Sequence, residues 1–152
     1  METDLTVTAE GGLGFEDGPD RGRVIVSGHD TNGRYSLMEW TVAPGHAEPP
    51  SFGAHRHDAL EETFYVRRGS LQFLLGETVS TLGPGDFVRV PPGMRHGYAN
   101  VSEGPVDLLV GFHPGGFEAL FVKYRSDQGR PAAGPGFMEE ACRDYATTFE
   151  AD

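Results

Sequence analysis

Short segments rich in valine, isoleucine, phenylalanine, tyrosine and threonine recur between glycine- and proline-containing turns, and this pattern constrains the fold more than any other feature. Eight such segments span residues 23–28, 34–42, 63–69, 70–75, 77–82, 86–90, 96–101 and 105–113. Their β-branched and aromatic content predicts strands, and tight turns such as Asn32-Gly33 favour antiparallel neighbours. The pattern therefore predicts an all-β sandwich or barrel and not alternating strand and helix units.

The spacing of apolar residues changes after Pro114. One set three and four positions apart predicts a short helix, and a second set at four-residue steps predicts another. The sets are Phe117, Leu120, Phe121 and Tyr124, then Phe137, Ala141, Tyr145 and Phe149. Such helices either pack plainly on the sandwich or form a lid over a cavity mouth. We predict a single domain over residues 1–152, with a barrel at about 22–113 and a helical tail at about 115–150.

Composition narrows the partners of this chain of 152 residues and 16.4 kDa. The 12 basic and 23 acidic residues give a net charge of −11, which disfavours nucleic acid and anionic membrane surfaces. Cys142 is the single cysteine, so no internal disulfide or thiolate metal cluster is expected. The N-terminus lacks a basic start and an apolar stretch, and no apolar run approaches the roughly 20 residues of a membrane span. We expect a soluble, cytoplasmic protein.

The stretch HRHDALEETFYVRRG, residues 55–69, contains candidate metal ligands. Successive side chains of a strand alternate between its faces, so His55 and His57 project to the same side. In the following strand the same alternation places Glu62 and Phe64 on one face and Glu61 on the other. We therefore expect Glu62 to join the two histidines.

A second stretch, GDFVRVPPGMRHGYAN, covers residues 85–100. A strand is followed by a rigid Pro-Pro-Gly reversal, and His96 begins the next strand. Tyr98 and Asn100 share the face of His96 under the same alternation. This segment brings a third imidazole toward the first two if the strands meet.

These two stretches resemble the paired motifs of the cupin superfamily. The fixed positions of the first motif are matched by His55, His57, Glu62 and Gly69, and those of the second by Gly85, Pro91, Gly93, His96 and Asn100. One departure is Pro49, where the first motif has a glycine; Gly45 fits after an insertion of four residues. We expect this insertion to change the cavity rim. The segment HPGGFEALFVKY and the tail also resemble small single-domain cupins labelled quercetin-dioxygenase-like.

The resemblance implies a double-stranded β-helix, a jelly-roll relative, with one or two short C-terminal helices. It also implies that His55, His57, Glu62 and His96 coordinate one divalent transition metal. Three imidazoles and a carboxylate suit Fe, Mn, Co, Ni, Cu or Zn without choosing among them. A metal-free barrel whose histidines make hydrogen bonds is the alternative.

Residues near these ligands are candidates for a substrate pocket. Phe64, Tyr98 and Asn100 are expected to line it because they share the faces of the ligands. His46 lies on the inserted loop and is the exception among the remaining histidines, which are expected to be exposed. Cupins of this size commonly pair, so the resemblance also implies a homodimer.

Three functions follow from this site. The first is a metal-dependent enzyme for a small, largely apolar or aromatic molecule, with dioxygenase chemistry of the flavonol-cleaving kind and Glu62 as general base. The second is a non-redox cyclase, isomerase or lyase that uses the metal as a Lewis acid. The third is a small-molecule binding protein without turnover. The same scaffold carries all three, so the fold alone does not decide between them.

Overall fold

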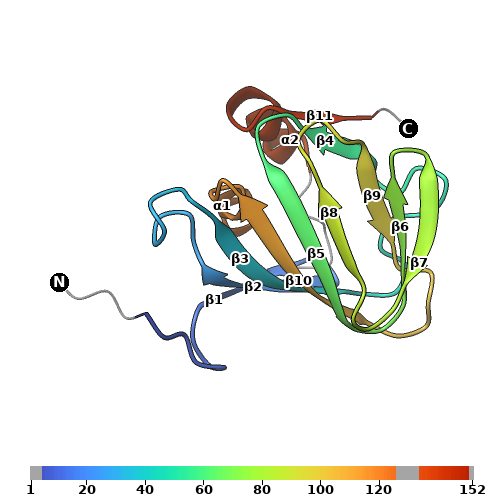
Figure 1. Cartoon of the computed structure of the whole chain (residues 1–152), viewed down its shortest axis with the longest axis horizontal. Coiled ribbons are helices and arrows are strands. Elements are labelled where there is room, and N and C mark those ends of the chain that lie inside the picture. Colours follow the sequence, from blue (N-terminus) through green and yellow to red (C-terminus); the bar gives the residue numbers. More distant parts are fainter. Residues whose placement is uncertain (1–4, 126–133, 151–152) are drawn as a thin grey trace.

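The structure is a computed structural model that describes residues 5–125 and 134–150. Within these ranges the chain forms eleven strands and two helices (Figure 1). The strands are β1 (Leu13–Asp17), β2 (Asp20–Val26), β3 (Ser36–Val42), β4 (His55–His57), β5 (Glu61–Arg68), β6 (Leu71–Leu75), β7 (Thr78–Leu82), β8 (Phe87–Val90), β9 (His96–Ala99), β10 (Val106–His113) and β11 (Thr147–Phe149). The helices are α1 (Glu118–Lys123) and α2 (Pro135–Asp144).

The strands form two antiparallel sheets, as the turn-rich sequence predicted. The six-stranded sheet has the order β1-β2-β3-β10-β5-β8, and the five-stranded sheet has the order β11-β4-β9-β6-β7. From β3 onward the chain passes to the other sheet after every strand except β6, which is followed by β7 in the same sheet. This arrangement is the predicted double-stranded β-helix, with the two helices at its C-terminal end.

The core lies between the sheets because each inner strand alternates buried and partly exposed residues. In β3 the burial alternates strictly from Ser36 to Val42, and Trp40 is almost fully buried. Phe64 of β5 packs edge-to-face against Phe73 of β6 with ring centroids 5.0 Å apart. Such aromatic contacts join the two sheets across the interior.

The structure corrects the sequence-based boundaries at both ends of the barrel. The first sheet already begins with β1, before the expected start near residue 22. At the other end α2 stops at Asp144, and Phe149 lies in strand β11 instead of the predicted helix. Ala146 has a φ of 47°, so the helical path ends there and the chain turns into the strand. The Pro-, Gly- and Ala-rich residues 129–136 also predict a loop between the two helices, and residues 129–133 lie outside the described residues.

Hydrogen bonds and strand pairing attach the two helices to one end of the barrel. The Glu118 carboxylate of α1 is buried and accepts hydrogen bonds from the backbone N–H groups of Gly28 (2.6 Å) and Gly116 (2.8 Å). Helix α2 leads into β11, which pairs with β4, so the tail lies beside the strand that carries two predicted metal ligands (Figure 1). Neither helix in the described ranges is long and apolar enough to cross a membrane.

Candidate metal centre and substrate cavity

Three strands from the two sheets bring the four predicted metal ligands together. His55 and His57 lie on β4, Glu62 on β5 and His96 on β9, and His55 is the direct antiparallel partner of His96. One ligand atom from each residue lies within 4.8 Å of the others. Opposite ligands of one ion stand about 4–4.4 Å apart when each bond is about 2.0–2.2 Å long, so small side-chain rotations close this set.

The sequence also chose correctly between the two adjacent glutamates. Glu62 points inward and is 7% exposed. Glu61 points outward, where its carboxylate forms an ion pair of 2.7 Å with Arg89. Strand alternation alone accounts for this difference.

Hydrogen bonds to the outer nitrogen of each imidazole fix the three rings. His55 Nδ1 donates to the Gly53 carbonyl at 2.8 Å, and His96 Nδ1 donates to the Met94 carbonyl at 3.0 Å, because a carbonyl oxygen can only accept. All three Nε2 atoms are thereby left for the common centre. Such anchoring of the outer nitrogen is typical of metal-binding histidines.

The outer nitrogen of His57 is held by the last strand of the tail. Thr147 Oγ1 donates its proton to the Tyr145 carbonyl at 3.2 Å, so its lone pairs accept from His57 Nδ1 at 2.9 Å. Thr147 is buried and lies 90 residues from His57 in the sequence. The C-terminal strand therefore completes the surroundings of the metal centre.

The charges in the cluster favour a cation at its centre. His96 Nε2 lies 2.9 Å and His57 Nε2 3.3 Å from Glu62 Oε2. Burial alone would raise the pKa of Glu62, yet the hydrogen bonds from His57 and His96 lower it well below its ordinary value. Burial alone would lower the pKa of His96, yet the hydrogen bond and charge of Glu62 raise it. Glu62 is therefore ionised and draws a positive charge to this point.

His55 is the neutral member of the cluster. Burial, followed by the charges of His96 and His57, lowers its pKa to about 4. His96 has Nδ1 directed at a carbonyl and Nε2 at a carboxylate, so it holds two protons unless an ion replaces the inner one. The Nε2 lone pair of His55 and the ionised carboxylate are ready ligands, and the donor set fits a divalent transition metal that takes the place of the inner protons.

An aromatic cavity of about 220 Å³ opens onto this cluster through His55. Strands, the inserted loop and both helices contribute to its wall. The lining residues are Asp17, Asp20, Trp40, His46, Phe52, Gly53, His55, Gly97, Tyr98, Phe117, Phe121, Phe137, Met138 and Phe149. His46, Phe52 and Gly53 confirm that the insertion shapes the cavity rim. The helices pack on the barrel and also cover the cavity.

The three predicted pocket residues have different positions. Tyr98 lines the cavity, whereas Phe64 and Asn100 are not part of its wall. Phe64 belongs to the core and packs against Tyr98 with ring centroids 5.7 Å apart. The Asn100 side chain donates to the carbonyls of Val42 (3.0 Å) and Gly104 (2.9 Å), so its amide fixes a turn.

The sequence did not indicate two cavity residues, Asp17 and Asp20, or the partner of His57, Thr147. Asp17 and Asp20 precede the expected start of the barrel, and Thr147 falls in the segment that was predicted as helix. In the sequence, the position of His46 on the inserted loop was the only indication of a polar group in the cavity wall. His46 Nδ1 lies 2.5 Å from Asp20 Oδ2.

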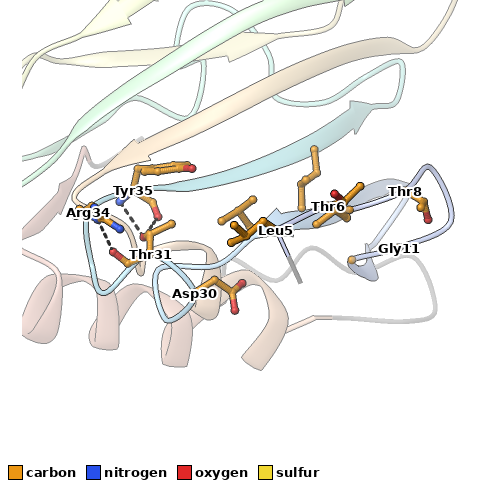
Figure 2. Close-up of a pocket in the computed structure, with 12 residues that line it drawn as sticks. Leu5, Thr6, Thr8, Gly11, Asp30, Thr31, Arg34 and Tyr35 are labelled. Carbon is orange, nitrogen blue, oxygen red and sulfur yellow. Dashed lines mark hydrogen bonds between the residues drawn. The ribbon is translucent and has the colours of Figure 1, made fainter. Parts of the chain in front are cut away.

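A second, larger cavity of about 550 Å³ lies between the N-terminal segment and the loop after β2. Figure 2 shows that Thr31, Arg34 and Tyr35 bond to one another at its edge. Thr31 Oγ1 donates to the Tyr35 carbonyl, Arg34 Nε donates to the Thr31 carbonyl, and Asp30 accepts from Ser27. These polar groups already form hydrogen bonds with residues close to them in the sequence. The aromatic cavity is therefore the better candidate for a functional site.

The fold and the paired histidine segments are similar to those of cupins. Residues 38–112 match the family model described as Cupin domain. Together with the solved structures of similar fold, this match supports placing the chain in the cupin superfamily. No curated protein matches the sequence.

Three solved structures illustrate the similarity of fold. Pac13 from Streptomyces, solved with uridine, is 22% identical over 74% of this chain and 84% of that chain, with a TM-score of 0.58. A cupin sugar phosphate isomerase from Silicibacter pomeroyi is 17% identical over 71% and 74%, with a TM-score of 0.58. A predicted oxalate decarboxylase from Thermotoga maritima is 18% identical over 62% and 80%, with a TM-score of 0.56.

Proposed function

We propose that this protein is a metal-dependent enzyme that acts on a small, largely apolar or aromatic organic molecule. The observation that carries this proposal is the aromatic cavity that reaches one edge of the cluster, His55, while His57, Glu62 and His96 are buried behind it. Four protein ligands leave positions free on a six-coordinate ion. A ligand in the cavity then meets the ion at these positions.

The size of the cavity limits the substrate. Its volume of about 220 Å³ lies below the roughly 300–1,000 Å³ of typical sites for drug-sized ligands. Phe52, Phe117, Phe121 and Phe137 are part of its apolar wall. A molecule built on one aromatic or similarly flat ring, with an oxygen atom directed at the metal, suits this space.

The first candidate reaction is non-redox: an isomerase, lyase or cyclase reaction on a carbonyl or enol. A bound divalent ion supplies a Lewis acid that stabilises negative charge on the substrate oxygen. Support comes from the neighbours, since Pac13 is described as a nucleoside dehydratase and a second structure as a sugar phosphate isomerase. Glu62 remains a ligand in this scheme, because its lowered pKa makes it a weak base while the histidines hold it.

The second candidate is dioxygenase chemistry of the quercetinase-like kind, which the resemblance of the motifs and tail favours. The cavity volume argues for a substrate smaller than a flavonol. Both candidates need the same metal centre and differ in their use of O₂.

Elemental analysis followed by turnover assays with and without O₂ tests the proposal. We expect about one transition-metal ion per chain and product formation from a one-ring enol or phenol. Product that forms equally without O₂ selects the non-redox candidate, and product that requires O₂ selects the dioxygenase. Thermal stabilisation by ligands without any product would instead identify a binding protein.

We also propose that the protein is a cytoplasmic homodimer that binds neither nucleic acid nor membranes. The net charge of −11 supports the absence of binding to nucleic acid and membranes. The single Cys142 supports the cytoplasmic location. Strand β1 is a sheet edge, and the exposed apolar residues Leu5, Leu13 and Tyr35 lie on or near it. Light scattering that gives the mass of one chain at all concentrations would contradict the dimer.

A further inference from the structure

Polar side chains that are buried (Asp20 and Trp40) or half-buried (His46 and Tyr98) gather in the cavity at a distance from the metal centre. His96 and Tyr98 are two residues apart on β9, which separates them by about 7 Å along the strand. The His46 ring stacks on the Tyr98 ring, with centroids 5.1 Å apart and an interplanar angle of 13°. We call Asp20, His46, Trp40 and Tyr98 the distal polar group. It lies about the length of one aromatic ring beyond the cluster.

Asp20 orients His46 within this group. The Asp20 carboxylate is 4% exposed; its Oδ1 accepts from the Ala43 backbone N–H at 2.7 Å, and its Oδ2 lies 2.5 Å from His46 Nδ1. Both carboxylate oxygens are thus engaged, and the imidazole ring is held by Asp20 and by the stacked Tyr98. Within the described part of the chain no protein group hydrogen-bonds to His46 Nε2. This nitrogen is therefore free for a ligand.

Trp40 supplies a hydrogen-bond donor, its indole N–H, to the distal polar group. Its side chain is 2% exposed and lines the cavity, yet its Nε1–H has no hydrogen-bond partner among the described residues. The Trp40 indole N–H lies close enough to the Tyr98 hydroxyl to oppose the rise that burial causes in the pKa of Tyr98, but the contact does not meet hydrogen-bond geometry. Native proteins rarely leave a buried donor unpaired, and an acceptor on a bound ligand explains this one.

We propose that the distal polar group is a second binding site in the cavity, which takes a hydroxyl group on the end of a one-ring aromatic ligand remote from the metal centre. The hydroxyl donates to His46 Nε2 and accepts from Trp40 Nε1–H. A hydroxyl suits both because it is donor and acceptor at once. The inference rests on the proposed function, since the other end of the ligand is an anionic oxygen at the metal.

The test uses two probes that differ only at the distal end. Zinc-loaded protein is titrated with benzoate and with 4-hydroxybenzoate by isothermal calorimetry. The carboxylate of each probe meets the metal, and only the second probe carries a distal hydroxyl. We expect 4-hydroxybenzoate to bind about tenfold more tightly, as for one well-made hydrogen-bonded group. The preference should fall to about onefold in His46→Leu and fall several-fold in Trp40→Phe, which keeps an aromatic ring.

The controls separate this inference from the proposed function. His29→Leu changes an exposed histidine and should keep the preference. Zinc-dependent binding of both probes with equal affinity, or a preference that survives in His46→Leu and Trp40→Phe, overturns the distal site and leaves the metal centre supported. Failure of both probes to bind the zinc-loaded protein overturns the proposed function and this inference together.

Discussion

The two walls of the aromatic cavity are built in different ways. The metal wall consists of β4, β5 and β9, whose three imidazoles and one carboxylate are fixed by strand pairing and by hydrogen bonds to Nδ1. The distal wall is assembled from β2, β3, β9, the inserted loop and both helices, and its polar core is the pair of Asp20 and His46. Strands therefore position the four candidate metal ligands, while strands, loop and helices together shape the space for a ligand.

The metal wall and the distal wall should therefore tolerate changes of sequence to different degrees. Metal ligands on paired strands have little freedom, because one step along a strand turns a side chain to the other face. Loops tolerate changes in length and sequence far better than strands do. We expect variants of the metal wall to change metal affinity and variants of the distal wall to change ligand preference.

Removal of one imidazole from the metal wall should have the largest effect. In His96→Ala we expect zinc affinity to fall by more than about 100-fold, because loss of an outer-sphere partner alone costs about 10–100-fold. The barrel should remain folded, since its core is apolar. Elemental analysis after dialysis, with circular dichroism, measures both properties. His29→Ala is the control, and equal metal content in His96→Ala and the parent would refute the ligand assignment.

The contact between the tail and the metal wall should have the next largest effect. In Thr147→Val the shape of the side chain is kept and the acceptor for His57 Nδ1 is lost. We expect zinc affinity to fall by about 10–100-fold. Competition with a chromophoric chelator measures the change. The neighbouring Thr148 is exposed, so Thr148→Val is the matched control; similar losses in the two variants would remove the special role of Thr147.

Metal affinity should also rise with pH. Glu62 raises the pKa of His96, so the metal-free cluster holds a proton that the ion must displace. Below the raised pKa, each pH unit downward should weaken zinc binding by about tenfold for one released proton. His55, with a pKa of about 4, is already neutral near pH 7 and adds no slope there. Chelator competition between about pH 5.5 and about pH 8 tests this, and a flat profile would contradict it.

The outward face of the metal wall should show the smallest effect. Glu61→Gln removes the ion pair with Arg89, whose side chain is 65% exposed. An exposed pair contributes at most about 1 kcal/mol to stability, so we expect a change in the free energy of unfolding below that value. Metal content should stay the same, whereas Glu62→Gln should lower it. Urea denaturation and elemental analysis of both variants measure the contrast.

The metal wall could be predicted from the sequence because its rules are local. Alternation along β4 and β5 placed His55, His57 and Glu62, and the motif resemblance added His96. Asn100 shows where the rule ends: β9 stops at Ala99, so alternation no longer applies and the side chain turns to Val42 and Gly104. Strand alternation predicts the direction of a side chain only for residues that lie within the strand.

The distal wall could not be predicted because it depends on contacts between distant segments. The pair of Asp20 and His46 joins residues 26 positions apart. At the metal wall, the contact of Thr147 with His57 spans 90 positions and was missed for the same reason. No period in the sequence marks such pairs. The four-residue spacing that extended the second helix to Phe149 also failed, because the turn at Ala146 outweighs apolar periodicity.

The inserted loop carries His46 and Phe52 without carrying any metal ligand. We expect its residues 45–54 to act as a cassette for ligand choice, which ends just before His55 and must keep the Gly53 carbonyl that anchors the His55 ring. Exchange of this cassette for loops of other composition should yield proteins that hold the same ion and accept different molecules. Selection for a new substrate in this scaffold therefore has a short, well-defined target.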